Sequence, residues 1–343
     1  MSTVNRRWVL ARRPEGKLQD RDFARADAEL TDLGPGEVRV RVTHLSFDAS
    51  QRLWTSVDSY MPAVPLGSVM RAMGVGQVVA SNHADFKPGQ LIRGLLGWQD
   101  YLQDKGEALL GPLTSMPAGI TPVQGLGVMG LTSLTAWFGV NEILKPRPGE
   151  VALVSGAAGA TGSVAGQVLK AAGARVIGIA GGAEKTQWVK DVAKFDECID
   201  YKNEDVSARL AALAPQGVNM VYENVGGEIL DAALEHLAKY ARVALCGAVS
   251  GYDTADFQGL KNYMNLVYKY GRIEGFLMGD YFPRAAEAVE GLAALQAKGQ
   301  LAFEVDLQEG FDNIPATLRR LYAGDNRGKQ LLKIADLPLP TAS

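Results

Sequence analysis

The first third of the chain consists of short runs in which apolar and polar residues alternate. The clearest of these runs read RRWVLARR, EVRVRVTHLSF, VGQVVASN and QLIRGLLGW. Glycine and proline separate them, as at Gly34-Pro35-Gly36 and Pro88-Gly89. A period of two is typical of strands with one buried face, and Gly/Pro punctuation marks the turns between them. The pattern predicts a mostly-β domain, either a curled sheet or a small barrel.

From Val151 onward, apolar runs of strand length alternate with helical segments such as AEKTQWVKDVAK and GEILDAALEHLAKY. The predicted strands read VALVS, ARVIGIA, ECIDY, NMVYENV, ARVALCG and RIEGFLM. This alternation predicts βαβ units and a parallel sheet, so the fold class is α/β. Six strands make a complete doubly wound Rossmann fold, which binds dinucleotides.

The segment after Leu301 returns to a mixed pattern, and we expect it to fold back onto the first domain. We therefore predict two domains. Residues 1–126 and 302–343 form the mostly-β domain, and residues 127–301 form the nucleotide-binding domain.

Composition narrows the range of partners. The 343 residues include 35 basic and 38 acidic side chains, for a net charge of −3, which gives no reason to expect nucleic acid or an anionic membrane as partner. No run approaches the roughly 18 apolar residues of a membrane span, and the start MSTVNRRWVLARRP does not resemble a signal peptide. Cys198 and Cys246 lie far apart, which favours reduced thiols and a cytoplasmic protein.

The strongest motif is the run VALVSGAAGATGSVAGQ, which contains Ala157-x-Gly159-x-x-Gly162. It follows a predicted strand and opens a predicted helix, as the dinucleotide fingerprint does. Small residues let a pyrophosphate approach the backbone, and the amides and dipole of the helix start bind its charge. Gly166 would allow close packing of helix and sheet. An ordinary tight strand-to-helix turn is the alternative.

The stretch GIAGGAEKTQ (178–187) bears on the choice between NAD(H) and NADP(H). NAD-binding folds carry an acid about 20 residues beyond the glycine loop for the ribose 2′-hydroxyl, but Ile179–Gly182 contains none. Gly181 and Gly182 leave room, and Lys185 supplies a positive charge for a 2′-phosphate. We therefore expect NADP(H). The alternative is that Lys185 is a solvated helix residue, and the neighbouring Glu184 weakens the argument for phosphate.

Several motifs together resemble the zinc-independent medium-chain dehydrogenase/reductase superfamily, in particular its NADP-dependent double-bond reductases. The matching stretches are RRWVLARRP, GWQDY (97–101), the loop at Gly159–Gly162, AGGAEK (180–185), YENVGG (222–227), CGAVSGY (246–252) and GDNRGK (324–329). The resemblance covers nearly the whole chain. It implies that residues 1–126 and 302–343 form a GroES-like substrate and catalytic domain, that residues 127–301 form a Rossmann NADP(H)-binding domain, and that the protein is a homodimer.

The resemblance also implies a reaction without metal. Zinc-dependent relatives carry a cysteine near the position of Ser46 and a Gly-His-Glu segment soon after, but Pro65–Gly76 contains neither His nor Glu. Without such a Lewis acid, oxidation of a simple alcohol is disfavoured. The reaction implied is reduction of an α,β-unsaturated carbonyl (an enone or enal), with hydride added to the β-carbon and fixed donors stabilising the enolate.

By the same resemblance, the backbone of the glycine loop binds the pyrophosphate, and Lys185 contacts the 2′-phosphate with help from Tyr201. The full set of expected cofactor residues is Gly159, Ala160, Thr161, Gly162, Lys185, Tyr201, Asn224, Cys246, Gly247, Ala248, Val249, Ser250, Gly251, Tyr252, Phe276, Leu277, Met278 and Asn326. Tyr252 is the expected catalytic residue, because a protonated phenol can donate to an enolate. The alternatives are a tyrosine that only packs at a loop edge and a proton taken from water. Tyr60 and Tyr252 are expected to contact substrate.

Departures from the family pattern leave the substrate open. Asp48-Ala49-Ser50-Gln51-Arg52 replaces the usual Asp-Pro-Tyr-Met-Arg, and Arg71 replaces a small or apolar residue. Arg71 either attracts acidic substrates or is an ordinary salt-bridged or exposed arginine. Two other functions also stay open: a quinone reductase of the same superfamily and a non-catalytic NADP(H)-binding protein.

Overall fold

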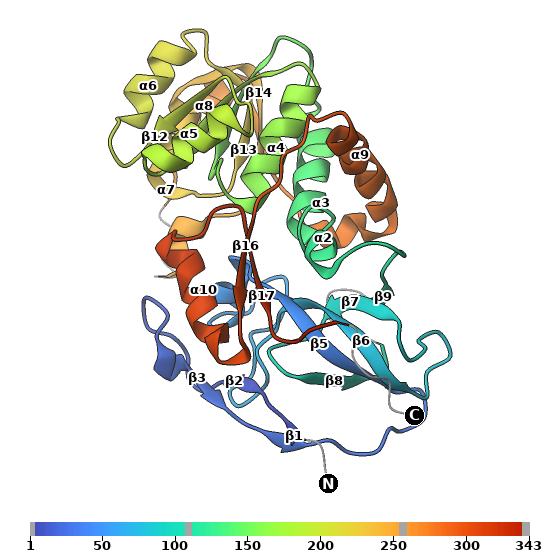
Figure 1. Cartoon of the computed structure of the whole chain (residues 1–343). Coiled ribbons are helices and arrows are strands. Elements are labelled where there is room, and N and C mark those ends of the chain that lie inside the picture. Colours follow the sequence, from blue (N-terminus) through green and yellow to red (C-terminus); the bar gives the residue numbers. More distant parts are fainter. Residues whose placement is uncertain (1–3, 107–111, 254–258, 338–343) are drawn as a thin grey trace. The chain divides into compact units, whose positions relative to one another are not determined.

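A computed structural model of the chain describes residues 4–106, 112–253 and 259–337 (Figure 1). The chain divides into two compact units. The first unit contains residues 1–126 and 305–343, and the second contains residues 127–304. Each unit has its own hydrophobic core, and each is described by itself below.

The first unit is built mainly from strands. Its strands are β1 (Val4–Asn5), β2 (Trp8–Leu10), β3 (Phe23–Arg25), β4 (Ala28–Glu29), β5 (Val38–Ser46), β6 (Met73–Ser81), β7 (Leu91–Leu95), β8 (Tyr101–Asp104), β9 (Thr114–Ser115), β16 (Val305–Glu309) and β17 (Lys329–Lys333). Its helices and helical turns are η1 (Asp20–Asp22), α1 (Ser50–Trp54), α2 (Pro122–Leu126), η5 (Phe311–Asn313) and α10 (Ile314–Ala323). The mostly-β N-terminal domain expected from the sequence is confirmed.

The main sheet of this unit runs in the order β16-β17-β5-β6-β7-β9, with β8 paired to β5. The residue pattern of β5 explains why this strand lies at the centre of the sheet. Val38, Val40 and Val42 are fully buried, while Arg39 and Arg41 between them are half-buried, as a period of two requires. The C-terminal strand β17 pairs antiparallel with β5, so a segment nearly 300 residues away in sequence completes the sheet.

The second unit alternates strands and helices. Its strands are β10 (Val151–Ser155), β11 (Arg175–Ala180), β12 (Glu197–Asp200), β13 (Val218–Glu223), β14 (Leu237–Leu245) and β15 (Arg272–Gly275). Its helices and helical turns are α3 (Leu131–Phe138), η2 (Gly139–Leu144), α4 (Ala160–Ala171), α5 (Ala183–Asp191), α6 (Val206–Leu213), α7 (Gly227–Glu235), η3 (Val249–Gly251), α8 (Met264–Tyr268), η4 (Met278–Arg284) and α9 (Ala285–Ala297).

All neighbouring strands of this second sheet are parallel, in the order β12-β11-β10-β13-β14-β15. That order is the doubly wound Rossmann arrangement, and it confirms the predicted six-stranded sheet. The carboxyl ends of β10 and β13 meet at the point where the chain reverses its direction of winding, and this is where such folds bind ligands.

Helices cover both faces of this sheet, as Figure 1 shows. Alternate residues of β10 divide between the two cores: Ala152 and Val154 pack with α3, α4 and α9, whereas Leu153 packs with α6 and α7. Strands buried on both faces are continuously apolar, which is why VALVS and ARVIGIA could be recognised in the sequence.

One predicted helix ends earlier than expected. The segment GEILDAALEHLAKY was predicted to be helical throughout, but α7 ends at Glu235 and β14 begins at Leu237. Leu230, Leu234 and Leu237 have helical spacing, so the pattern alone favoured a longer helix. Leu237 instead pairs with Val218 of β13, and this tertiary pairing decides the structure. None of the helices in the described part of the chain is long and apolar enough to cross a membrane.

Candidate functional site

The glycine loop between β10 and α4 is too tightly built to accept larger residues. A Cβ on Gly162 would lie 2.3 Å from the Gly156 carbonyl oxygen, and Gly156 itself adopts a φ of 61°. Both positions therefore require glycine. The Ala157 amide donates to Ile179 of β11 at 2.9 Å, which fixes the loop against the neighbouring strand.

The start of α4 presents backbone donors above this loop. The Ser163 amide donates to Gly159 O at 3.0 Å. The amides of Ala160, Thr161 and Gly162 therefore have no acceptor within the helix, because the first turn of any α-helix leaves its N–H groups unpaired. The helix is 12 residues long, so its dipole adds to the attraction for an anion. These residues fit a dinucleotide pyrophosphate.

A second pair of glycines follows β11. A Cβ on Gly181 would lie 2.7 Å from the Tyr201 ring and 3.0 Å from Cε of Lys202, so both side chains lie against this glycine. Gly182 has a φ of 92° and caps α5. Lys185 is half-buried in the first turn of that helix. A cation at a helix N-terminus opposes the helix dipole, so helix stability does not explain this lysine.

An acid does lie beside this corner, on the adjacent strand. Asp200 is the last residue of β12 and pairs in register with Ala180. Its carboxylate accepts hydrogen bonds from the Gly182 amide at 2.7 Å, from the Lys202 amide at 3.1 Å and from Asn203 Nδ2 at 2.8 Å. The Gly182 hydrogen bond is the largest cause of the lowered pKa of Asp200. The carboxylate is therefore engaged in holding the loop.

Asn224 joins the glycine loop to the end of β13. Its amide donates to Ser155 Oγ at 2.8 Å and its Nδ2 donates to Ser155 O at 2.7 Å. Its carbonyl accepts from the Val249 amide at 3.1 Å, in the loop that follows β14. The structure therefore brings three predicted stretches together at one edge of the sheet: the glycine loop, Asn224 and the segment 246–252.

Tyr252 lies at the end of that segment and is half-buried. Its hydroxyl oxygen accepts a hydrogen bond from the Ala248 amide at 3.3 Å. The oxygen is the acceptor at this contact. The hydroxyl also lies close to Gly247, where a Cβ would be 3.1 Å from it.

The other predicted residues of the second unit differ in how deeply they are buried and in what they contact. Burial raises the pKa of Cys246 to about 11, so this thiol is no nucleophile at neutral pH. Phe276 meets the ring of Tyr222 edge-on, with the ring centres 6.3 Å apart. Met278 is only 6% exposed and packs in the core, whereas Leu277 is 45% exposed.

Two predicted residues belong to the first unit. The Tyr60 hydroxyl accepts from Trp54 Nε1 at 3.1 Å, and burial is the main cause of its raised pKa. Asn326 is buried, and its Nδ2 donates to Gly328 O at 3.0 Å within the same turn.

The segment that departs from the family pattern is held by a buried ion pair. Lys329 of β17 is 2% exposed, and its ammonium group contacts the Asp48 carboxylate and donates to Phe47 O at 3.0 Å. Arg71 donates to Pro62 O at 2.5 Å. Among the described residues no ion pair with a carboxylate is found for Arg71, which is half-buried.

The position that holds a metal-binding cysteine in zinc-dependent relatives has another use here. Ser46 donates from Oγ to Asp48 Oδ2 at 2.6 Å. Within residues 4–106, 112–253 and 259–337, no group of three or more His, Cys, Asp or Glu side chains is placed to hold a metal ion.

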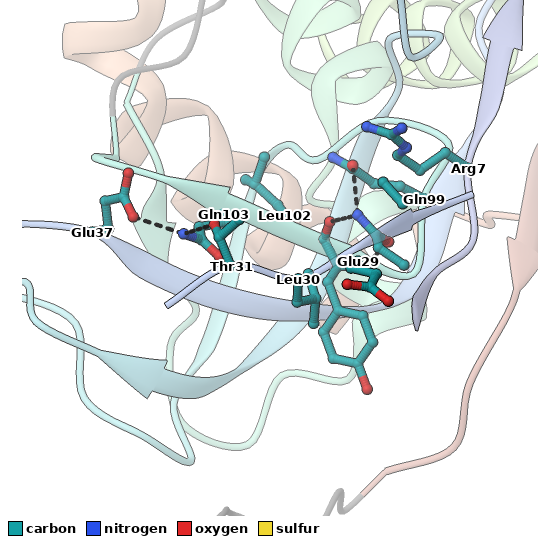
Figure 2. A pocket seen from close by; sticks show the side chains of 11 residues that line it. Arg7, Glu29, Leu30, Thr31, Glu37, Gln99, Leu102 and Gln103 are labelled. Carbon is teal, nitrogen blue, oxygen red and sulfur yellow. Dashed lines mark hydrogen bonds between the residues drawn. The ribbon is translucent and has the colours of Figure 1, made fainter. Parts of the chain in front are cut away.

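A pocket of about 350 Å³ lies in the first unit, away from every predicted site residue of that unit. Figure 2 shows Gln103 donating to Glu37 and Thr31, and the Asn5 amide group donates in turn to Gln99 and Tyr101. The polar groups of this pocket thus already bind one another, and it is not a candidate active site.

Sequence reasoning missed two residues of the second unit. Lys202 lies beside Tyr201 against Gly181, and its only sequence signal is its place directly after a strand end. Glu223 ends β13 and is fully buried beneath Asn224. An acid inside the quoted YENVGG motif was a signal that could have been used.

The chain is similar to known proteins over most of its length. Residues 6–111 match the family described as N-terminal domain of oxidoreductase, and residues 160–294 match the family described as zinc-binding dehydrogenase. The NADPH-dependent curcumin reductase of Escherichia coli is 36% identical, with 96% of this chain and 97% of that protein covered. The NADP(+)-dependent 2-alkenal reductase of Nicotiana tabacum is 33% identical, with 88% of each chain covered.

A solved structure agrees with the fold. The crystal structure of CurA from Vibrio vulnificus in complex with NADPH superposes with a TM-score of 0.90 at 35% identity, covering 96% of this chain and 99% of that one. The chain therefore belongs to the medium-chain dehydrogenase/reductase superfamily and, within it, to the family of NADP-dependent double-bond reductases.

Proposed function

We propose that the chain is an NADPH-dependent reductase of the C=C bond in α,β-unsaturated carbonyl compounds, acting without a metal ion. The observation that carries this proposal is the similarity over 96% of the chain to the NADPH-dependent curcumin reductase. The glycine loop, whose amides and dipole fit a pyrophosphate, supports it from the structure.

The cofactor would be held by groups from several strand ends. The amides of Ala160, Thr161 and Gly162 would bind the pyrophosphate, as the geometry of the α4 start favours. Lys185, Tyr201 and Lys202 would surround the 2′-phosphate. The remaining proposed cofactor contacts are Gly159, Asn224, Cys246, Gly247, Ala248, Val249, Ser250, Gly251, Tyr252, Phe276, Leu277, Met278 and Asn326.

When bound, NADPH supplies the hydride that saturates the β-carbon of the substrate. The chain's own part is to stabilise the negative charge that collects on the carbonyl oxygen. We assign this to Tyr252, whose hydroxyl is fixed by the Ala248 amide and can donate its proton. Tyr60 is proposed to contact the substrate in addition, on its resemblance to a substrate-pocket tyrosine.

The test is a panel of enones, enals and quinones assayed for oxidation of NADPH and NADH. We expect enones or enals to oxidise NADPH faster than quinones do, and NADPH to be preferred over NADH. Faster turnover of quinones would favour a quinone reductase. Tight NADPH binding without turnover of any acceptor would favour a non-catalytic NADP(H)-binding protein.

We also propose a homodimer that forms through the outer side of β15. This strand ends the six-stranded sheet, and three of its four residues are exposed. Beside it lies a set of exposed apolar side chains: Tyr240, Tyr263, Met264, Val267, Tyr268 and Tyr270. Pairing with a second copy would bury both the strand edge and this patch.

Light scattering on the purified chain tests the dimer. We expect twice the chain mass for the wild type and a shift toward the chain mass for Val267→Lys. A wild type that is monomeric at micromolar concentration would contradict the proposal. A cytoplasmic location, proposed because both cysteines are free, is checked by cell fractionation.

A further inference from the structure

Glu223 occupies the point where three loops of the candidate cofactor site converge. It is the last residue of β13, and its side chain is completely buried. Carboxylates are almost never fully buried unless they are paired. In the described part of the chain it has no cationic partner within ion-pair distance, so its burial has to be explained by the hydrogen bonds that it makes.

One carboxylate oxygen collects three donors. Oε1 accepts from Ser155 Oγ at 2.8 Å, from the Val225 amide at 2.6 Å and from the Gly226 amide at 2.7 Å. Ser155 belongs to β10 and precedes the glycine loop. Val225 and Gly226 belong to the turn that starts α7, where Gly226 has a φ of 77°. The carboxylate therefore joins two loops from neighbouring strands.

The hydroxyl group of Ser155 links Glu223 to Asn224 through two hydrogen bonds. Its hydroxyl proton is used toward Glu223, so its oxygen is the acceptor for the Asn224 amide at 2.8 Å. Asn224 Nδ2 then donates to Ser155 O, directly before Gly156. The position of Asn224 and the first turn of the glycine loop thus depend on the same hydroxyl, which the carboxylate orients.

The backbone of Glu223 reaches the third loop. Its carbonyl accepts from the Cys246 amide at 2.9 Å and from the Gly247 amide at 3.2 Å. These two residues lead into the turn that places Tyr252. Side chain and main chain of one residue therefore tie together the ends of β10, β13 and β14.

The other carboxylate oxygen, Oε2, lowers the stability of the folded chain. Oε2 is buried without a hydrogen-bond partner among the described residues. Burial of an unsatisfied polar atom lowers stability, and burial is also the main cause of the raised pKa of Glu223. The three hydrogen bonds to Oε1 offset part of this cost.

We propose that Glu223 is a positioning residue of the cofactor site, acting through Ser155 and Asn224. The inference rests on the proposed NADPH-dependent reductase function. Removing the carboxylate should displace the glycine loop and Asn224 relative to each other. A displacement of about 1 Å at a site of this kind costs about 100-fold in rate.

The test compares Glu223→Ala, Glu223→Gln and Ser155→Ala with the wild type in the full chain. The readouts are the NADPH dissociation constant from cofactor fluorescence, kcat and KM for an enone, and the melting temperature. We expect Glu223→Ala to raise the dissociation constant at least about tenfold and to lower kcat/KM about 100-fold. Glu223→Gln keeps an acceptor oxygen and should restore most of both.

Glu150→Gln is the matched control. Glu150 precedes the other end of β10 and pairs with Arg242 at 2.6 Å, so its loss affects stability and leaves cofactor affinity unchanged. A folded Glu223→Ala that binds NADPH and reduces the enone like the wild type overturns the inference. If Glu223→Ala does not fold, Ser155→Ala decides: an unchanged dissociation constant overturns the inference, and a raised one supports it. A wild type that fails to bind NADPH instead overturns the proposed function.

Discussion

At the scale of single residues, the turn at Gly181 and Gly182 after β11 brings together two lysines, an aromatic ring and an acid that is held by hydrogen bonds. Lys185 and Lys202 come from different strand ends, and the Tyr201 ring lies beside Gly181. The Asp200 carboxylate accepts hydrogen bonds from the Gly182 and Lys202 amides, which hold it against the loop. The two lysines are the groups that would favour an additional phosphate over a bare hydroxyl.

This corner gives a prediction on cofactor choice. Lys185→Ala should raise the NADPH dissociation constant about tenfold or more and leave that of NADH nearly unchanged, because a hydrogen bond to a charged group contributes about 1.5–3 kcal/mol. Lys202→Ala should act in the same direction. Fluorescence titration with both cofactors measures the effect. Lys190→Ala, an exposed lysine in the last turn of α5, is the control. Equal losses of affinity for both cofactors would mean that Lys185 is a solvated helix residue without a role in cofactor choice.

A second prediction concerns Tyr252. Tyr252→Phe keeps the ring and removes the hydroxyl that accepts a hydrogen bond from the Ala248 amide. If that hydroxyl stabilises the enolate, kcat for an enone should fall about 100-fold, the lower range for a general acid. NADPH affinity should change little. Tyr101→Phe, in the pocket of the first unit that is away from the predicted site residues, is the control. Full turnover by Tyr252→Phe would mean that Tyr252 is not the essential acid.

At the scale of elements, the sequence predicts strands better than it predicts how their ends are connected. The six predicted runs of the second unit all became strands, and the clearest of them, β10 and β11, are buried on both faces and so leave a continuous apolar signal. The boundary at Leu237 was missed, since its helical spacing competes with pairing to Val218. Lys202 and Glu223 were missed for another reason. Lys202 lies against Gly181, which follows a different strand, and Glu223 is bound by Ser155 of β10; no local pattern reports such contacts between strand ends.

The packing of α4 supplies a prediction at this scale. A Cβ on Gly166 would lie 1.8 Å from Cζ of Phe195, so the helix can approach the sheet only with glycine there. Gly166→Ala should lower the free energy of unfolding by about 1–3 kcal/mol, partly offset by the better helix propensity of alanine. Urea unfolding measures it. Phe195→Leu in the same chain should recover about 1 kcal/mol or more of the loss, because the two changes are in contact. Purely additive effects would contradict the explanation.

At the scale of the whole molecule, each unit has a core of its own and buries polar groups as well. In the first unit, Lys329 and Asp48 join β17 to the end of β5. His44 lies on the same strand pair, is 7% exposed, and contacts Thr43 Oγ1 through Nδ1 at 3.1 Å. The Thr43 hydroxyl donates to Val75 O, so His44 is the donor at this contact.

His44 predicts how the stability of the folded chain depends on pH. Burial, and then Lys333, lowers its pKa from 6.5 to about 4. Between these values the unfolded chain binds a proton that the folded chain does not, so stability rises with pH. We expect the histidine to contribute a loss of about 3 kcal/mol in the free energy of unfolding as pH falls from 6.5 to 4. Urea unfolding at several pH values checks this. His44→Asn should flatten the curve in this window, and identical curves for both proteins would contradict the assignment.

The contact between Gly181 and Tyr201 limits how cofactor preference can change. An aspartate introduced at Gly181 to select NADH would put its Cβ 2.7 Å from the Tyr201 ring and 3.0 Å from Lys202. The exposed Tyr201 ring and the end of the Lys202 side chain would therefore have to move before an aspartate fits at Gly181. A change of cofactor preference at Gly181 thus depends on what stands at positions 201 and 202, so substitutions at these three positions are coupled.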